Sequence, residues 1–469
     1  METKNISDKA AVRWTALALL AATMFFSHML IDILSPLKTQ LEQTVNWSST
    51  VFGAYGSSEY FINVFAGFLI FAGIILDKMG IRFTAVLSGS LMVIGAGIKV
   101  YALGEAFNTG GSWLFELLDS EAFPASAKLA CAGFAVFGCG SEMAGITVSR
   151  AIVKWFRGKE MALAMGLEMG CARLSVFAIF WLSPMISAHF SYDKYLMIQA
   201  PMIFVFILLC IGLILYIVYG FFDRALDRQL EEQKLSGGGD EGEEPFRFSD
   251  LRLVFGSRMF WIVAILCMLY YSAIFPFQKF ATEMLWSNVG MRPENAAKLF
   301  SLFPVGALFL TPFMGAFIDY RGKGASMLIV GGILVTACHL TFAVFPFQEV
   351  GSAAIPIATA AILILGVSFS LVPAALWPSI PKIIDEKVLG SAYSAIFFIQ
   401  NIGLMSVPFV IGWSLDVTNQ GLAPDEPKNY FVPMLIFTSF GVVALLMGFV
   451  LKFEDRRKKY GLELPNKVR

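Results

Sequence analysis

The stretch Gly73-Ile-Ile-Leu-Asp77-Lys-Met-Gly80-Ile-Arg82 is echoed later in the chain by Gly315-Ala-Phe-Ile-Asp319-Tyr-Arg321-Gly322-Lys323-Gly324. Each copy reads G-x-x-x-D, followed by a glycine and by basic residues. The first glycine lets neighbouring helices approach closely, and the aspartate can pair with a base or with a helix N-terminus. The later glycine, Gly80 or Gly322, suits a tight turn. Two copies in matching places predict two halves built on one plan.

Composition indicates a membrane protein. The chain has 469 residues, of which 57% are hydrophobic and only 15% are charged, whereas about a quarter of the residues in soluble proteins are charged. Apolar runs of about 20 residues recur, which is the length that crosses a bilayer as a helix. We therefore expect an all-α polytopic membrane protein with twelve transmembrane helices, at 14–36, 50–76, 83–103, 126–153, 161–187, 196–219, 259–284, 298–318, 325–345, 355–378, 389–415 and 430–451.

The longest break between apolar runs divides the chain into two six-helix halves. Within it, residues 235–244 read Leu-Ser-Gly-Gly-Gly-Asp-Glu-Gly-Glu-Glu, which is typical of a flexible acidic linker. The expected organisation is a first half at 1–219, a linker at 220–258 and a second half at 259–469.

Basic residues predict the orientation of the chain. Fifteen of the 35 Lys and Arg residues fall in five loops at alternate positions, and ten more fall in the two tails. Lys and Arg concentrate on the cytoplasmic side of membrane proteins, so these loops and both termini should be cytoplasmic. Lys99, Lys128 and Arg150 lie near span ends, where their side chains can extend to the membrane surface. Lys279 should lie near the outer end of its span.

Glu142 and Arg173 stand on either side of the basic turn Lys154-Trp155-Phe156-Arg157-Gly158-Lys159-Glu160. Each is about 18–21 Å from that turn along a helix, so both charges should lie near the middle of a hydrocarbon core about 30 Å thick. Charges at that depth are costly and are usually functional. A structural ion pair is the alternative, although a buried pair stabilises poorly once desolvation is counted.

The same counting predicts a mid-membrane layer of polar residues from both halves. Carriers bind substrate where their halves meet, so the expected substrate-binding groups are Glu142, Arg173, Asp32, Tyr270, Tyr271, His339, Trp377, Gln400 and Asn401. Candidates for carrying a proton are Glu59, Glu168 and His28. Structural interpretations stay open: packing for the aromatic rings and histidines, an inner-gate role for Glu168, and a bond between His28 and Asp32, one helical turn apart.

Missing motifs narrow the function. The sequence has no phosphate-binding loop, nucleophile elbow or metal-ligand spacing, so we expect neither an enzyme nor a cofactor. The six cysteines fall inside apolar segments and should be packing residues. Acidic and basic residues balance at 35 each, and we expect no nucleic-acid partner. The expected partners are the lipid bilayer and a small-molecule substrate.

The two loops resemble the signature loop of the major facilitator superfamily, whose six-helix halves rock around a central site. This resemblance implies gating roles for Gly73, Asp77, Gly80, Arg82, Gly315, Asp319 and Arg321. Other segments resemble the lysosomal dipeptide carriers of animals and their relatives, among them Ser141-Glu142, Ala172-Arg173, Tyr270-Tyr271, Ala375-Leu376-Trp377-Pro378 and Ile399-Gln400-Asn401. The second resemblance implies facilitated diffusion of dipeptides, with Glu142 and Arg173 holding the amino and carboxylate ends.

Departures from those carriers shape the remaining expectations. The N-terminal tail has no evident acidic dileucine sorting signal, and Glu59 and Glu168 are additional acids. We therefore expect the plasma (inner) membrane of a prokaryote rather than a lysosomal membrane. We also expect a monomer, and the need for an accessory subunit stays open. Beside a uniporter for dipeptides or similar zwitterions, two hypotheses remain: a proton-coupled organic-anion carrier anchored by Arg173, and a membrane scaffold or sensor that no longer transports.

Overall fold

The structure, a computed structural model, describes residues 6–110, 112–157, 159–235, 248–385 and 388–465. This part of the chain is helical and contains no strand, which confirms the all-α prediction. The first half comprises α1 (Ala10–Asp32), α2 (Lys38–Val45), α3 (Ser49–Ser58), α4 (Phe61–Phe65), α5 (Phe68–Leu103), α6 (Glu105–Asn108), α7 (Trp113–Leu118), α8 (Ala125–Phe156), α9 (Met161–His189) and α10 (Lys194–Leu235). The second comprises α11 (Phe248–Gly256), α12 (Arg258–Val289), α13 (Pro293–Phe300), α14 (Leu302–Arg321), α15 (Gly324–Val344), α16 (Ala354–Leu376), α17 (Ile380–Ile383), α18 (Leu389–Thr418) and α19 (Phe431–Lys458).

Eleven helical segments of the described residues are long and apolar enough to cross a membrane, one fewer than predicted. The difference arises because α5 combines the end of the second predicted span with the whole third span, across Gly80 at φ 78° and ψ 171°. The chain turns back at Gly80, since the Lys99 ammonium lies 5.0 Å from the centre of the Tyr55 ring. Together with α3 and α4, these eleven segments make the twelve predicted passes, and the second pass consists of α3, α4 and the start of α5.

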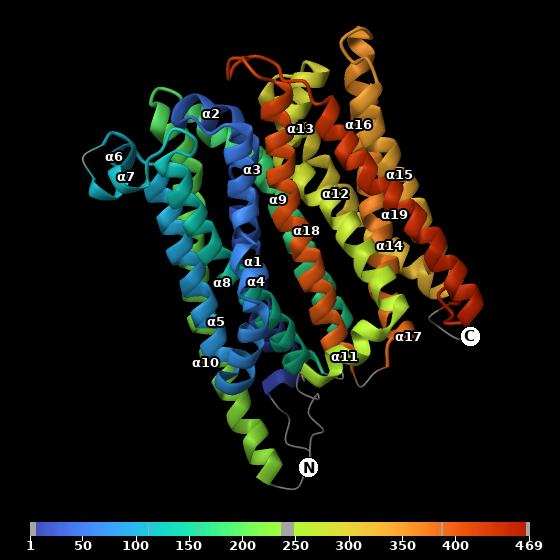
Figure 1. Cartoon of the computed structure of the whole chain (residues 1–469). Coiled ribbons are helices and arrows are strands. Elements are labelled where there is room, and N and C mark those ends of the chain that lie inside the picture. The colour runs from blue at the N-terminus through green and yellow to red at the C-terminus, as the bar shows by residue number, and fades with distance from the viewer. Residues whose placement is uncertain (1–5, 111, 158, 236–247, 386–387, 466–469) are drawn as a thin grey trace.

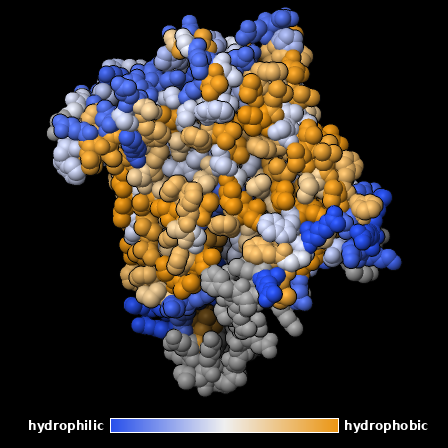
Figure 2. All heavy atoms as spheres, in the orientation of Figure 1, coloured by the Kyte–Doolittle hydropathy of each residue, from blue (hydrophilic) through white to orange (hydrophobic). Residues whose placement is uncertain are grey.

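The helices form a bundle with both ends of the chain at one end of it (Figure 1). We call that end the terminal end and the opposite one the far end. Hydrophobic residues form a band across the face seen in Figure 2, and hydrophilic residues gather above and below it. This distribution suits a protein that crosses a bilayer. The two halves meet where α3 packs on α18 and where α9 packs on α14.

Glycine allows the closest contact between the halves at one position but not at two predicted ones. A side-chain carbon at Gly412 of α18 would overlap the backbone carbonyl of Ser49 at the start of α3, so the two backbones touch there. By contrast, nothing lies within 4 Å of a side-chain carbon added at Gly73 or Gly315. The expectation that these two glycines mediate close helix approach is wrong for this conformation, because no neighbouring helix reaches them.

The first signature loop joins three helices at the terminal end. Gly80 has a positive φ, a conformation that other residues rarely adopt, so its predicted turn is confirmed. Asp77 pairs with Arg150 of α8, and Arg82 lies 3.4 Å from Asp227 of α10. These contacts hold α5, α8 and α10 together within the first half.

The matching loop of the second half is held by the C-terminal segment. Gly322 has φ 72°, so its predicted turn is also confirmed. The backbone N–H of Lys323 donates to the carbonyl of Glu463, and that of Gly324 donates to the carbonyl of Leu462, both at 3.0 Å. The segment after α19 thus binds the loop between α14 and α15.

The predicted linker is shorter than the sequence pattern indicates. Residues 220–235 continue α10 as helix, and residues 248–256 form α11. The extension of α10 is held by Lys154, which lies 2.7 Å from Asp223 and 2.6 Å from Asp227. Residues 236–247, which carry most of the glycine-rich acidic segment, lie outside the described residues.

Candidate functional site

Arg173 reaches from the first half to aromatic rings of the second. Its guanidinium carbon lies 4.2 Å from the centre of the Phe369 ring on α16 and 5.9 Å from that of Phe275 on α12. A guanidinium over an aromatic face is attracted by the ring quadrupole, more strongly where water is excluded. The contact fixes one face of the guanidinium and leaves the N–H groups at its edge to bind an anion.

Four side chains of the second half, Tyr271, Phe275, Phe369 and Trp377, form what we call the aromatic box. Tyr271 stacks on Phe275 with 5.4 Å between ring centres, and Phe275 meets Phe369 edge to face at 5.6 Å. Trp377 donates its indole N–H to the Tyr271 hydroxyl at 3.2 Å. Two helices, α12 and α16, and the turn after α16 therefore assemble an apolar wall beside Arg173.

Glu142 is held by the second half rather than by Arg173. The α8 glutamate is half-buried, and its side chain is hydrogen-bonded to that of Asn401 on α18. Among the described residues, no ion pair joins Glu142 and Arg173. The two charges predicted at mid-depth are thus both engaged by the opposite half, and a structural ion pair is not what holds them.

His28 and Asp32 lie beside this site but do not bond each other as the sequence allows. His28 is within electrostatic range of Arg173, and its Nδ1 is 2.7 Å from the carbonyl of Met24 on its own helix. Asp32 accepts a hydrogen bond from Gln278 of α12. Asp32 therefore connects α1 to the second half, and His28 does not share in that contact.

A buried cluster of charges lies next to Asp32, and the sequence misleads about the exposure of one of its members, Lys99. The Lys279 ammonium is 3.8 Å from carboxylate oxygens of both Asp32 and Glu59. Lys99 is fully buried, with its ammonium 3.8 Å from the centre of the Phe134 ring. The expectation that Lys99 extends to the membrane surface is therefore wrong, because neighbouring helices enclose its side chain.

A small cleft between the halves connects this cluster to the aromatic box. Asp32 and Tyr60 line it from the first half, and Phe275, Pro276 and Lys279 line it from the second. The ring of Phe275 borders the cleft, and its centre is 5.9 Å from the guanidinium carbon of Arg173. The site therefore combines a cation, carboxylates and an apolar wall at the boundary of the two halves.

Four of the predicted residues lie away from this boundary or apart from the others. His339 packs between Phe277 and Phe437, with Nε2 2.9 Å from the carbonyl of Ala273, inside the second half. The Tyr270 hydroxyl donates a hydrogen bond to the Leu328 carbonyl, and the Gln400 side chain accepts one from the Cys267 thiol at 3.3 Å. Glu168 is half-buried on α9. In the signature loop, Asp319 and Arg321 belong to the last turn of α14.

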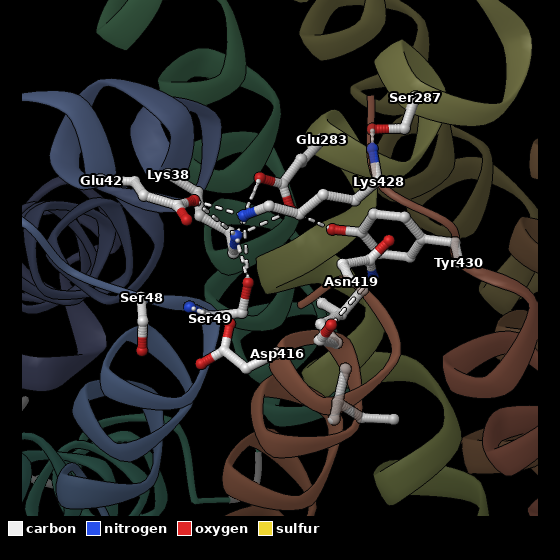
Figure 3. A network of polar contacts seen from close by, with 12 residues as sticks. Lys38, Glu42, Ser48, Ser49, Glu283, Ser287, Asp416, Asn419, Lys428 and Tyr430 are labelled. Carbon is white, nitrogen blue, oxygen red and sulfur yellow. Dashed lines mark hydrogen bonds and ion pairs between the residues drawn. The ribbon is translucent and has the colours of Figure 1, made fainter. Parts of the chain in front are cut away.

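A network of charges joins the halves at the far end (Figure 3). The Lys38 ammonium from α2 lies 2.7 Å from the Glu283 carboxylate of α12, with 1% of each side chain exposed. Lys428, in the loop before α19, pairs with Glu42 and lies 3.3 Å from Glu283. The Tyr430 hydroxyl also donates to Glu283. We call Lys38, Glu42, Glu283 and Lys428 the far-end network.

Two further features strengthen closure at the far end. Asp416 of α18 accepts from the backbone N–H groups of Ser49 at 2.9 Å and Thr50 at 2.7 Å, so a carboxylate of the second half caps α3 of the first. Burial lowers the pKa of Lys428, but two neighbouring carboxylates outweigh it, so that pKa lies above its ordinary value. Sequence analysis missed the network because pairing between distant loops leaves no local spacing signal.

The chain matches known proteins over nearly its whole length. The sequence model of the Major Facilitator Superfamily matches residues 20–408. The Lysosomal dipeptide transporter MFSD1 of Bos taurus is 26% identical over 442 residues, which covers 93% of this chain and 86% of that relative; its Homo sapiens counterpart is 26% identical over 414 residues, which covers 87% and 81%. The crystal structure of a D-xylose-proton symporter has the same fold, with a TM-score of 0.66 at 13% identity over 93% of this chain and 97% of that one. The chain therefore belongs to the major facilitator superfamily, and it is a membrane transporter rather than an enzyme.

Proposed function

We propose that this transporter moves dipeptides or similarly small zwitterions by alternating access around Glu142 and Arg173. The observation that carries the proposal is that an acid and an arginine of the first half are each engaged by the second half and not by each other. A zwitterion offers one cation and one anion, and it can satisfy both groups at once. The curated relatives named dipeptide transporters support this substrate class.

The chemistry of the two groups suits the two ends of a peptide. Arg173 presents a planar fork of N–H donors that matches a carboxylate. Glu142 can accept hydrogen bonds from an ammonium group, with the Asn401 amide beside it. The aromatic box offers apolar area without fixed hydrogen-bonding demands, and such a wall tolerates different side chains. We infer that the box contacts the side chain next to the substrate's carboxylate end.

We further propose that the terminal end faces the cytoplasm, because the basic loops and both tails lie there. The far end then faces the outside, and the far-end network closes it. In this assignment the conformation is closed to the outside, and outward opening requires the network and the Asp416 cap to separate. The plasma (inner) membrane of a prokaryote remains our proposed location.

Proteoliposomes loaded with unlabelled dipeptide test the proposal by exchange against external labelled dipeptide. The purified parent should exchange, Arg173→Ala should not, and Arg173→Lys should exchange weakly because it keeps the charge but loses the fork. Arg292→Ala, at the exposed start of α13, is the matched control and should equal the parent. Exchange by Arg173→Ala at the parental rate would refute the site.

A further inference from the structure

His28 of α1 faces the boundary between the halves with one ring nitrogen unoccupied. Asp32, one helical turn further along α1, lines the cleft and accepts a hydrogen bond from Gln278 of α12, and residues four apart lie on one face of a helix. His28 is half-buried, and its Nδ1 lies 2.7 Å from the Met24 carbonyl. No group in the described part of the chain bonds to Nε2, and the protein does not enclose that nitrogen. Nε2 is therefore open to a molecule that enters the site.

His28 lies between the helices that carry Glu142 and Arg173. The Ser27 hydroxyl is 3.1 Å from that of Ser141 on α8, and these two serines directly precede His28 and Glu142. On the other side, Arg173 of α9 is within electrostatic range of His28. Helix α1 packs against both α8 and α9. The open nitrogen thus belongs to the same part of the first half as the two groups proposed to hold the ends of the substrate.

The contact with Met24 decides which ring nitrogen carries the proton. A carbonyl oxygen can only accept, so Nδ1 must donate its N–H to it. A neutral imidazole has a single N–H, and Nε2 is then a hydrogen-bond acceptor. A second positive charge beside the Arg173 guanidinium would be unfavourable, and the carboxylate of Asp32 is already engaged by Gln278 and Lys279. His28 therefore presents a neutral acceptor to the site.

A dipeptide brings one further donor between its two charged ends, the peptide N–H. With the ammonium at Glu142 and the carboxylate at Arg173, this N–H lies in the middle of the bound molecule. It loses its water on entering the site, and a desolvated donor without a partner is costly. Glu142 and Arg173 are already engaged by the ends of the substrate, and Arg173 has no acceptor. Nε2 of His28 is the acceptor that lies between them.

We propose that His28 determines specificity by accepting a hydrogen bond from the peptide N–H of the substrate. This inference rests on the proposed function and narrows its substrate class. Dipeptides whose second residue is proline or is N-methylated lack that N–H, and they leave Nε2 without a partner. The transporter therefore selects dipeptides with a secondary peptide bond and disfavours those with a tertiary one.

Competition against exchange of labelled alanyl-glycine in proteoliposomes tests the proposal with three unlabelled compounds. They are alanyl-glycine, alanyl-sarcosine, which carries a methyl group on the peptide nitrogen, and the ester O-alanyl-glycolate, in which oxygen replaces the N–H without added volume. The parent should bind alanyl-glycine about tenfold more tightly than either analogue. His28→Phe should bind all three within about threefold of each other, with KM for alanyl-glycine raised and the maximal exchange rate little changed. His28→Gln keeps an acceptor and should regain part of the preference.

His189→Phe makes the same substitution at an exposed histidine that ends α9, and it should keep the parental preference. His28→Leu takes the place of His28→Phe if the phenylalanine variant does not fold, and the comparison of alanyl-glycine with its ester needs the parent alone. Equal binding of these two compounds by the parent, or an undiminished preference in His28→Phe, overturns the role of His28. In either case exchange that is lost in Arg173→Ala leaves the dipeptide function standing. A parent that exchanges no dipeptide refutes that function and this inference with it.

Discussion

The Lys38 ammonium of the first half and the Glu283 carboxylate of the second lie 2.7 Å apart with 1% of each side chain exposed. Neither residue has any intrinsic need to be buried, and a lone charge in that place would be costly. The pair is therefore stable only while the halves meet at the far end. Whether this ion pair can form therefore depends on whether the transporter is closed or open at the far end.

Glu283→Gln should shift the transporter toward opening at the far end. The substitution removes the carboxylate that pairs with the buried Lys38, and loss of one partner of a buried ion pair costs about 3–5 kcal/mol in other proteins. It also removes a carboxylate that lies 3.3 Å from the Lys428 ammonium. A cysteine introduced at Thr39, in the cleft lined by Lys38 and Glu283, should react several-fold faster with a membrane-impermeant maleimide. The measurement is the labelling rate in sealed right-side-out vesicles.

The control for that experiment is Glu294→Gln, an exposed acid at the start of α13 on the same side. It should leave the labelling rate unchanged. Equal rates in the parent and Glu283→Gln would show that the far-end network does not hold the halves together.

Phe369→Leu should weaken substrate binding more than turnover. Leucine keeps an apolar contact but removes the aromatic face 4.2 Å from the Arg173 guanidinium. Loss of a cation–π contact worth about 1 kcal/mol should raise KM for a dipeptide about fivefold with kcat little changed, since the contact persists in every bound state. Phe309→Leu on α14, where the ring is 63% exposed, should match the parent. A changed kcat with unchanged KM would contradict the positioning role of Phe369.

The sequence indicated how far along their helices Glu142 and Arg173 lie, but it did not indicate their partners. Counting residues from the basic turn predicts the height of both groups, because a straight helix converts sequence distance into height. Their contacts with Asn401 and Phe369 depend on how two distant halves dock, and no periodicity records that. Arg173 could therefore be identified as a candidate site residue from its own segment, whereas nothing in the sequence distinguished Phe369 from a phenylalanine of the core.

Lys99 and Lys279 show the same limit, because the groups that surround them could not be predicted from the sequence. Near a predicted span end, a lysine is expected to extend to water, and that rule fails where other helices cover the end. The aromatic rings that enclose Lys99 come from α3 and α8, and the acids beside Lys279 come from the opposite half. The fold class followed from composition and the repeated loop, but the buried cluster of charges next to Asp32 required the packed structure.

Glu463→Ala should lower thermal stability without abolishing transport. The Glu463 carboxylate accepts from the Ser326 backbone N–H at 2.7 Å and from its hydroxyl at 2.8 Å, so it caps the N-terminus of α15. Loss of such a cap costs about 1 kcal/mol, which corresponds to a melting temperature lower by about 2–4 °C for a half of this size. Differential scanning fluorimetry in detergent measures the shift. Glu294→Ala, which removes an exposed acid at the other end of the bundle, should leave the melting temperature where it is.

Glu142→Gln should remove the preference for a free amino terminus. In the parent, a dipeptide ammonium gains a charge-assisted hydrogen bond from Glu142, worth about 1.5–3 kcal/mol, and an N-acetylated dipeptide lacks it. The parent should therefore prefer the free dipeptide by about tenfold to a hundredfold. In Glu142→Gln the two competitors should inhibit exchange of labelled dipeptide at concentrations within about threefold of each other.

Glu168→Gln is the matched control, because it neutralises another half-buried acid of the first half that the structure does not bring to Asn401. This variant should keep the parental preference for the free amino terminus. If it loses that preference as fully as Glu142→Gln does, the effect belongs to the overall charge of the first half. If Glu142→Gln keeps the preference, the amino end is bound elsewhere, and Asp32, across the cleft from Phe275, becomes the group to replace next.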